Sequence, residues 1–127
     1  MRFLLLLCLL PLVLAGCDSS SREETEPDNC SSINTTTSSQ IITIHDEVCS
    51  SVNITGDGNS ISVEDSNDII LLSLNGSNNL VTIDPGATVE TIDVNGNDNT
   101  LYIPDSLIFQ LNDNGIGNQI FYTDPTP

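Results

Sequence analysis

Residues 72–83 read LSLNGSNNLVTI and residues 92–103 read IDVNGNDNTLYI, so the two segments match column by column at a spacing of 20 residues. The same pattern precedes them at residues 52–63, VNITGDGNSISV. In each segment, apolar and polar side chains alternate on both sides of a turn rich in Asn, Gly and Ser. Alternation with a period of two is typical of strands with one buried face, so each segment predicts two short strands joined by a turn.

Working outward from these segments, five copies of the pattern fill the chain from Cys30 to Tyr122. Residues 30–44 and 49–63 match at a spacing of 19, residues 69–83 and 89–103 follow, and residues 106–122 form a fifth copy with a shortened start and a turn two residues longer. The inward side chains expected on the first strands are Ile33 and Thr35, Val52 and Ile54, Leu72 and Leu74, Ile92 and Val94, and Phe109 and Leu111. On the second strands they are Ile42 and Ile44, Ile61 and Val63, Val81 and Ile83, Leu101 and Ile103, and Ile120 and Tyr122.

The repeats predict an all-β fold, a short β-solenoid of the parallel β-helix type with about five rungs of 19–20 residues. One repeat cannot bury its own apolar face, whereas stacked repeats form a continuous core. A β-sandwich or meander is the alternative, because Asn75-Gly76 and Asn95-Gly96 are strong hairpin turns. The near-constant spacing favours the solenoid, since a meander has no need of it. We expect almost no helix beyond the first 16 residues.

Two columns of turn residues stand out. We expect the amide side chains of one column to stack as a structural ladder, each bonding its neighbours above and below; its members are Gln40, Asn59, Asn79, Asn99 and Asn118. The glycines of the other column, Gly56, Gly76 and Gly96, are expected to supply positive φ angles. Thr37 and Asp113 stand in the glycine column of the first and last copies.

The recurring pattern apolar-x-Gly-x-x-Asn-x-apolar-x-apolar, as in VNGNDNTLYI, resembles the small bacterial Asn/Gly-rich repeat proteins grouped as domain of unknown function family 3060. The resemblance covers about the last three quarters of the chain. It implies a fold and carries no activity.

The first 16 residues, MRFLLLLCLLPLVLAG, are typical of a secretory signal peptide and too short to span a bilayer. They run into Leu14-Ala15-Gly16-Cys17, which resembles the lipobox of bacterial lipoproteins. The resemblance implies cleavage before Cys17, acylation of this residue with chains such as palmitate, and a membrane anchor that does not cross the bilayer. An ordinary signal peptide with an incidental cysteine is the alternative.

Four segments follow from this interpretation. Residues 1–16 are a lipoprotein signal peptide, and residues 17–29 are the lipidated Cys and a flexible acidic linker without large apolar side chains. Residues 30–122 form the repeat domain, and residues 123–127 form a loose tail.

Cys30 and Cys49 occupy the same column of adjacent rungs, which predicts α-carbons about 5 to 6 Å apart, within the range for a disulfide. In an exported protein such a pair is expected to be oxidised. A zinc or redox role lacks a CxxC motif and neighbouring His ligands.

Charge restricts the partners. The chain has 18 Asp and Glu, 2 Arg, no Lys and a formal net charge of −16. Nucleic acid is therefore not an expected partner, because phosphate binding needs clustered basic residues.

The chemistry-bearing residues give no catalytic set, no metal site and no cofactor. His45 is the single His and has only Asp46 and Glu47 beside it, so we expect no enzyme activity. The acidic turns around Asp57, Asp93 and Asp113 invite a calcium interpretation, but their spacing fails the EF-hand pattern. The sequence predicts a non-catalytic binding or structural protein of the bacterial cell envelope, facing the periplasm or the cell surface, with an envelope protein as partner. A binder of cell-wall or surface glycan and a Ca²⁺-responsive module are the alternatives.

Overall fold

The computed structural model describes residues 30–48 and 50–124, and within them every regular element is a β-strand. Short strands of alternating polarity form here because β-branched and Leu side chains pack on one face while Ser, Thr and Asn face water. The strands are β1 (Ser31–Thr35), β2 (Ile41–Ile44), β3 (Ser50–Ile54), β4 (Ser60–Val63), β5 (Asp68–Leu74), β6 (Leu80–Ile83), β7 (Thr88–Val94), β8 (Thr100–Pro104), β9 (Gln110–Asp113) and β10 (Gln119–Thr123).

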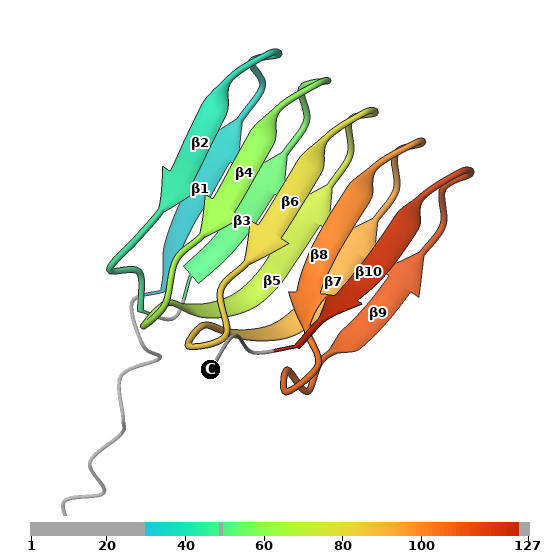
Figure 1. The fold of residues 1–127 in the computed structure, drawn as a ribbon. Helices are drawn as coiled ribbons and strands as arrows, with labels where there is room; N and C mark the ends of the chain where they lie inside the picture. Colours follow the sequence, from blue (N-terminus) through green and yellow to red (C-terminus); the bar gives the residue numbers. More distant parts are fainter. Residues whose placement is uncertain (1–29, 49, 125–127) are drawn as a thin grey trace, which may run out of the picture.

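The strands form two parallel sheets, one from the odd-numbered strands in the order β1-β3-β5-β7-β9 and one from the even-numbered strands in the order β10-β8-β6-β4-β2. The two strands of one repeat lie in different sheets, and each pairs with the equivalent strands of neighbouring repeats (Figure 1). The predicted β-solenoid is confirmed, with five rungs. The meander alternative is wrong, because consecutive strands do not pair with each other.

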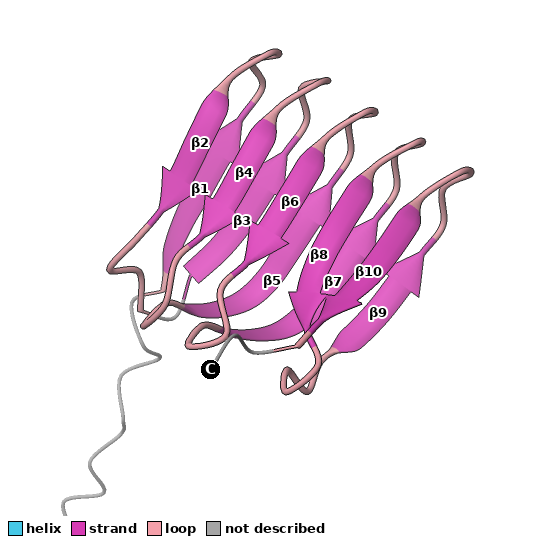
Figure 2. Cartoon of the chain, viewed as in Figure 1, coloured by secondary structure: helices cyan, strands magenta, loops and turns pink. Residues whose placement is uncertain are grey.

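Each repeat contributes one strand to each sheet, and corners join the strands (Figure 2). One corner is the tight turn between the two strands of a repeat, and the other leads to the next rung. The parallel register keeps equivalent residues in line, for example Val52↔Leu72 and Leu72↔Ile92 in the first sheet. Spacings of 19 or 20 residues are therefore the length of one circuit around the stack.

The core consists of apolar side chains that stack in columns between the two sheets. Predicted inward residues of the three middle rungs, such as Val52, Leu72, Ile92 and Leu101, are fully buried. Ile69 and Val89 extend this core into the second corner and are also buried. Most apolar residues of the end rungs, such as Ile33 and Leu111, are only half-buried, since each end rung has a neighbour on one side alone, whereas Ile44 of the first rung is buried.

The predicted register of the fifth rung is wrong by two residues. The structure pairs Ile92 with Leu111 and Val94 with Asp113, so Phe109 precedes β9 rather than lying opposite Ile92. The turn of this rung accordingly has the usual length. The apolar pair Phe109 and Leu111 misled the interpretation, because Asp113 occupies an inward position that is apolar in the middle rungs.

Candidate functional site

The tight corners form the most regular polar feature of the molecule, and we call them the asparagine turns. They comprise residues 36–40, 55–59, 75–79, 95–99 and 114–118, stacked along one side of the solenoid (Figure 1). Asn59, Asn79 and Asn99, at the last position of the three middle turns, are buried, with exposed fractions of 1% or less. Buried amides generally have hydrogen-bond partners, and the turns supply them except at Nδ2 of Asn79, which is buried without one.

Each buried Asn side chain bonds to the backbone of the rung before it. Oδ1 of Asn79 accepts from the backbone N–H of Asn59 at 2.8 Å, and Oδ1 of Asn99 accepts from that of Asn79 at 2.8 Å. At the ends of the column, Asn59 accepts from the N–H of Gln40 and Asn118 from that of Asn99, both at 2.9 Å. The column that we predicted from sequence is therefore aligned along the stack.

The bonding differs from the predicted amide-to-amide ladder. Nδ2 of Asn99 donates to the carbonyl of Gly76 at 3.0 Å, and Nδ2 of Asn118 donates to that of Gly96 at 3.0 Å. The side chains thus join rung to rung mainly through backbone groups, because the turn carbonyls lie within reach of a short amide. The column also contains one bond between side chains, in which Nδ2 of Asn99 donates to Oδ1 of Asn118 at 3.2 Å.

A true amide ladder lies at the first turn position, which sequence reasoning missed. Nδ2 of Asn95 donates to Oδ1 of Asn75, and Nδ2 of Asn114 donates to Oδ1 of Asn95, both at 3.1 Å. These three side chains are exposed. The Asn that precedes Gly76, Gly96 and Gly115 was the signal that could have found it.

Gly56, Gly76 and Gly96 do not have positive φ angles, so that prediction is wrong. Positive φ falls two residues later, for example at Gly58, Asn78 and Asp98, with φ of 66°, 58° and 54°. Gly76 is needed for close approach instead, since a Cβ there would lie 2.0 Å from the carbonyl oxygen of Gly56. Gly56 and Gly96 have the same constraint, with distances of 1.7 and 1.8 Å to the carbonyls of Thr37 and Gly76.

The end rungs differ from the middle ones at this position. Gly115, and not Asp113, occupies the glycine column of the fifth rung, because its Cβ would lie 1.8 Å from the carbonyl oxygen of Gly96. The error follows from the register shift described above. Thr37 stands in the column of the first rung, where the carbonyl of Thr37 itself faces Gly56.

A second polar ladder runs along the outer tip of the turns. The backbone N–H of Ser77 donates to Oδ1 of Asp57 at 2.6 Å, and that of Ile116 donates to Oδ1 of Asn97 at 2.9 Å. These carboxylate and amide oxygens thus replace the missing strand pairing at the turn. The acidic turn residue Asp57 therefore has a structural role.

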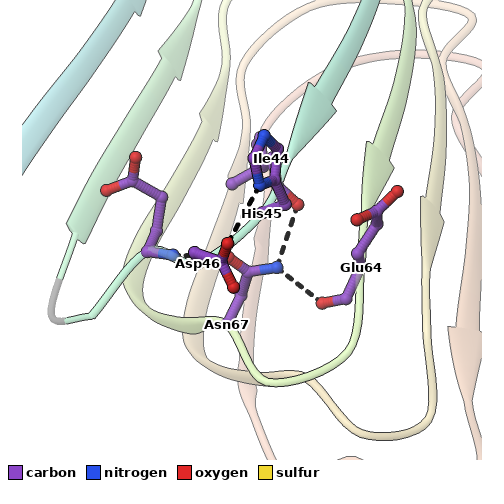
Figure 3. A network of polar contacts seen from close by, with 6 residues as sticks. Ile44, His45, Asp46, Glu64 and Asn67 are labelled. Carbon is purple, nitrogen blue, oxygen red and sulfur yellow. Dashed lines mark hydrogen bonds and ion pairs between the residues drawn. The ribbon is translucent and has the colours of Figure 1, made fainter.

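The opposite corner holds a buried asparagine that sequence reasoning also missed. Nδ2 of Asn67 donates to the carbonyls of Ile44 and Glu64 at 2.9 and 2.6 Å, and its Oδ1 accepts from the N–H of Glu47 at 2.9 Å (Figure 3). Asn67 is 2% exposed. Its signal in the sequence was weak, because the other rungs have no Asn at this position.

His45 lies beside this corner and contacts its neighbour in the sequence. Its Nδ1 is 3.3 Å from Oδ2 of Asp46, and the side chains are 65% and 91% exposed (Figure 3). An exposed pair of this kind lacks the buried, oriented geometry of an acid-base set. Within residues 30–48 and 50–124, no group of three or more His, Cys, Asp or Glu is placed to hold a metal ion.

The outer face of the even-numbered sheet has an exposed aromatic pair. The rings of Tyr102 and Phe121 stack with centroids 5.3 Å apart and an interplanar angle of 21°. The strands β8 and β10 place them in register. Phe121 belongs to the last rung, so the stack of rings ends at an open edge.

A cavity of about 420 Å³ lies where the fifth rung is short. The strand β7 begins at Thr88, whereas β9 first pairs with it at Thr91. Val89 and Glu90 line the cavity on one side and Leu107 and Ile108 on the other. The shortened start expected from the sequence thus leaves the beginning of β7 without a neighbouring strand on this side.

The last corner contains a pair of carboxyl groups. Partial desolvation raises the pKa of Asp105 above its ordinary value of 3.8, and Asp124 raises it further through a side-chain hydrogen bond and its negative charge. The backbone N–H of Asp105 donates to the carbonyl of Thr123 at 3.0 Å, which holds the two segments together.

The predicted cysteine sites lie at the boundary of the described chain. Cys17 and Cys49 fall outside the described residues, whereas Cys30 is described and has a bonding partner. The Cys30–Cys49 pairing therefore stays a prediction. The described part of the chain includes no helix that is long and apolar enough to span a membrane.

Comparison with known proteins adds no relative. No family model matches the chain, and searches of curated proteins and of solved structures found no match.

Proposed function

We propose that this chain is an exported bacterial lipoprotein whose solenoid acts as a non-catalytic binding or structural module in the cell envelope. The observation that carries the proposal is the apolar leader that ends in Leu14-Ala15-Gly16-Cys17. Cleavage before Cys17 and its acylation would anchor the protein to a membrane with the solenoid facing the periplasm or the cell surface. More than one acyl chain gives the stable anchoring that a single chain does not.

The described structure supports a binding role through its shape. The first strand begins at Ser31, so the acidic residues between Cys17 and this strand would act as a spacer between anchor and solenoid. The solenoid presents flat sheet faces, short turns and one cavity beside β7. The turn pattern Gly-x-x-Asn also supports kinship with domain of unknown function family 3060.

Charge indicates the chemistry of a partner. Residues 30–124 contain 13 of the 18 Asp and Glu and neither Arg, so the solenoid has no Lys or Arg side chain. A protein surface with Lys and Arg would complement it and would associate faster at low salt. Nucleic acid and anionic headgroups would be repelled.

A disulfide between Cys30 and Cys49 would fasten the first rung. Ser31 pairs with Ser50 in β1 and β3, and Cys30 and Cys49 directly precede these two residues in the sequence. Closing a loop of this length stabilises a fold by about 3 kcal/mol. Mass spectrometry of peptides from the unreduced protein tests the pairing, and a free Cys30 thiol would contradict it.

Glycan binding is the second candidate, and the aromatic pair Tyr102 and Phe121 favours it. Aromatic rings beside exposed hydroxyl and amide side chains offer the mixed surface that sugars contact, and Tyr102 and Phe121 are 37% and 44% exposed. Retention of the protein on isolated cell wall, lost on Phe121→Ser but kept on Ile116→Ser, would support it. Ile116 is an exposed apolar residue on another side of the molecule.

Calcium response is the third candidate. A rise of Tm with Ca²⁺ that Mg²⁺ does not reproduce would support a specific site. Equal small shifts with the two ions would indicate screening of the negative charge alone.

Crosslinking in the native cells tests the proposal itself. The tagged full-length chain is crosslinked and its adducts are identified by mass spectrometry, with Cys17→Ser as the unanchored control and metabolic labelling with palmitate as a check on acylation. Acylation that depends on Cys17, with protein adducts lost in the Cys17→Ser variant, is the expected result. Absence of acyl chains on the wild-type protein would overturn the lipoprotein proposal, and recovery of wall fragments alone would favour the glycan binder.

A further inference from the structure

The two ends of the solenoid are open and would match each other in a stack of copies. The strands β1 and β2 form one end, β9 and β10 form the other, and each of these strands is paired on one side only (Figure 1). Because Ile33 and Leu111 stand in one register column and Ile42 and Ile120 in another, a second copy added head to tail would place Leu111 beside Ile33 and Ile120 beside Ile42. These four side chains are only partly buried in the single chain. Open edges with apolar columns are templates for association.

We propose that Thr37, Gln40 and Asp113 block this head-to-tail stacking, so that copies of the solenoid do not add to one another. The three residues stand at positions that the three middle rungs fill with Gly, Asn and an apolar residue. Each interferes with a different contact that holds neighbouring rungs together.

Thr37 removes the space that stacking requires. In the four later rungs, a Cβ at the equivalent glycine would lie 1.7 to 2.0 Å from the carbonyl oxygen of the rung before. The first turn shares the positive φ of the later turns at its fourth position, with 58° at both Ser39 and Asn78. The Cβ of Thr37 would therefore meet the carbonyl oxygen of Gly115 in a preceding copy at a similar distance, which atoms do not tolerate.

Gln40 is turned away from the position that its column requires. Its Nε2 donates to the carbonyls of Ser38 and Ser39 in its own turn, at 3.1 and 3.4 Å. Asn99 and Asn118 instead donate to carbonyls of the preceding rung. The side-chain amide of Gln40 thus bonds to carbonyls of its own turn, and it offers no such bond to another copy.

Asp113 places a charge where a further rung would bury it. Its column continues from Ile54 through Leu74 and Val94, each fully buried. In the single chain the carboxylate is exposed and accepts from the N–H of Gly115 at 3.1 Å and from Nδ2 of Asn118 at 2.7 Å. Thr35 of a second copy would cover it without offering a positive charge, and burying an unpaired carboxylate is strongly unfavourable.

A mixing experiment tests the block. One full-length variant, Asp113→Val, opens the last rung, and another, Thr37→Gly with Gln40→Asn, opens the first rung. Sedimentation of each protein in detergent should give a monomer, and their mixture should give a 1:1 complex. A single chain with all three substitutions should form rods with the rung spacing of about 4.8 Å along their axis.

The matched control carries Thr55→Gly and Asp65→Val, which are the same kinds of change at exposed positions away from the two ends of the solenoid. Circular dichroism establishes that every variant is folded. Failure of the mixture and of the triple variant to associate would overturn the proposal, as would stacking of the wild-type chain or of the control.

Discussion

The backbone N–H of Asn79 donates a 2.8 Å hydrogen bond to Oδ1 of Asn99, one rung further along the solenoid. This bond lies in the interior, because both residues are 1% exposed or less. It satisfies a backbone donor that the turn cannot pair within its own rung. The same side chain satisfies the carbonyl of Gly76 through Nδ2. The asparagine side chain thus replaces the backbone hydrogen bonds of strand pairing at the turn, where the chain changes direction.

The buried and exposed asparagines of one turn should differ sharply in their contribution to stability. Asn99→Ala leaves the N–H of Asn79 and the carbonyl of Gly76 buried without partners, which should lower the free energy of unfolding by about 3 kcal/mol. Asn95→Ala breaks only exposed amide bonds and should cost about 0.5 kcal/mol or less. Urea denaturation followed by circular dichroism measures both. Similar losses in the two variants would contradict the distinction.

The glycines allow an equally direct comparison. Gly76→Ala places a Cβ 2.0 Å from the carbonyl oxygen of Gly56, so the rungs must move apart and the free energy of unfolding should fall by roughly 3 kcal/mol. Gly58 is the matched control, because its Cβ would meet nothing closer than 3.8 Å and Asn78 holds an equivalent φ. Gly58→Asn should therefore change stability by about 0.5 kcal/mol at most. A neutral Gly76→Ala would show that the stack accommodates a methyl group here.

A substitution at Ser50 should raise the free energy of unfolding instead of lowering it. Its side chain is fully buried in line with Ile69 and Val89, and its Oγ has no hydrogen-bond partner. Ser50→Ala removes a hydroxyl that was desolvated without compensation, so the variant should be more stable by about 1 kcal/mol. Thermal unfolding measures the change, with Ser51→Ala on the outer face as the control. A loss of stability in Ser50→Ala would mean that the hydroxyl has a partner in solution.

The sequence predicted the middle rungs well because a period of two fixes which face of a strand is buried. Val52, Leu72 and Ile92 follow this rule and lie in the core. The rule failed in the last rung, where Asp113 faces inward at an edge that water still reaches. Pattern alone favoured the apolar Phe109 instead.

The hydrogen-bond partners of the turn amides could not be predicted from the sequence, for a different reason. A column of Asn predicts stacking, but an amide bonds equally well to another amide or to a backbone group. The choice depends on how closely Gly56 and Gly76 let the turns approach, which is a property of the assembled stack. For the same reason Asn67 gave no signal, since its three bonds join corners that only the fold brings together.

Asp105 and Asp124 should make the last corner sensitive to acid. Desolvation and the hydrogen bond and charge of Asp124 raise the pKa of Asp105 above 3.8, so the folded chain binds this proton more tightly than the unfolded chain. The resulting stabilisation is fully present below pH 3.8 and is lost as the pH rises through the raised pKa. Asp124→Asn should move the pKa of Asp105 back toward its ordinary value and flatten this part of the stability profile. Carboxyl NMR titration of both proteins measures the shift, with Asp65→Asn as a control at another corner. An unchanged titration of Asp105 in Asp124→Asn would mean that Asp124 does not contribute to the shift.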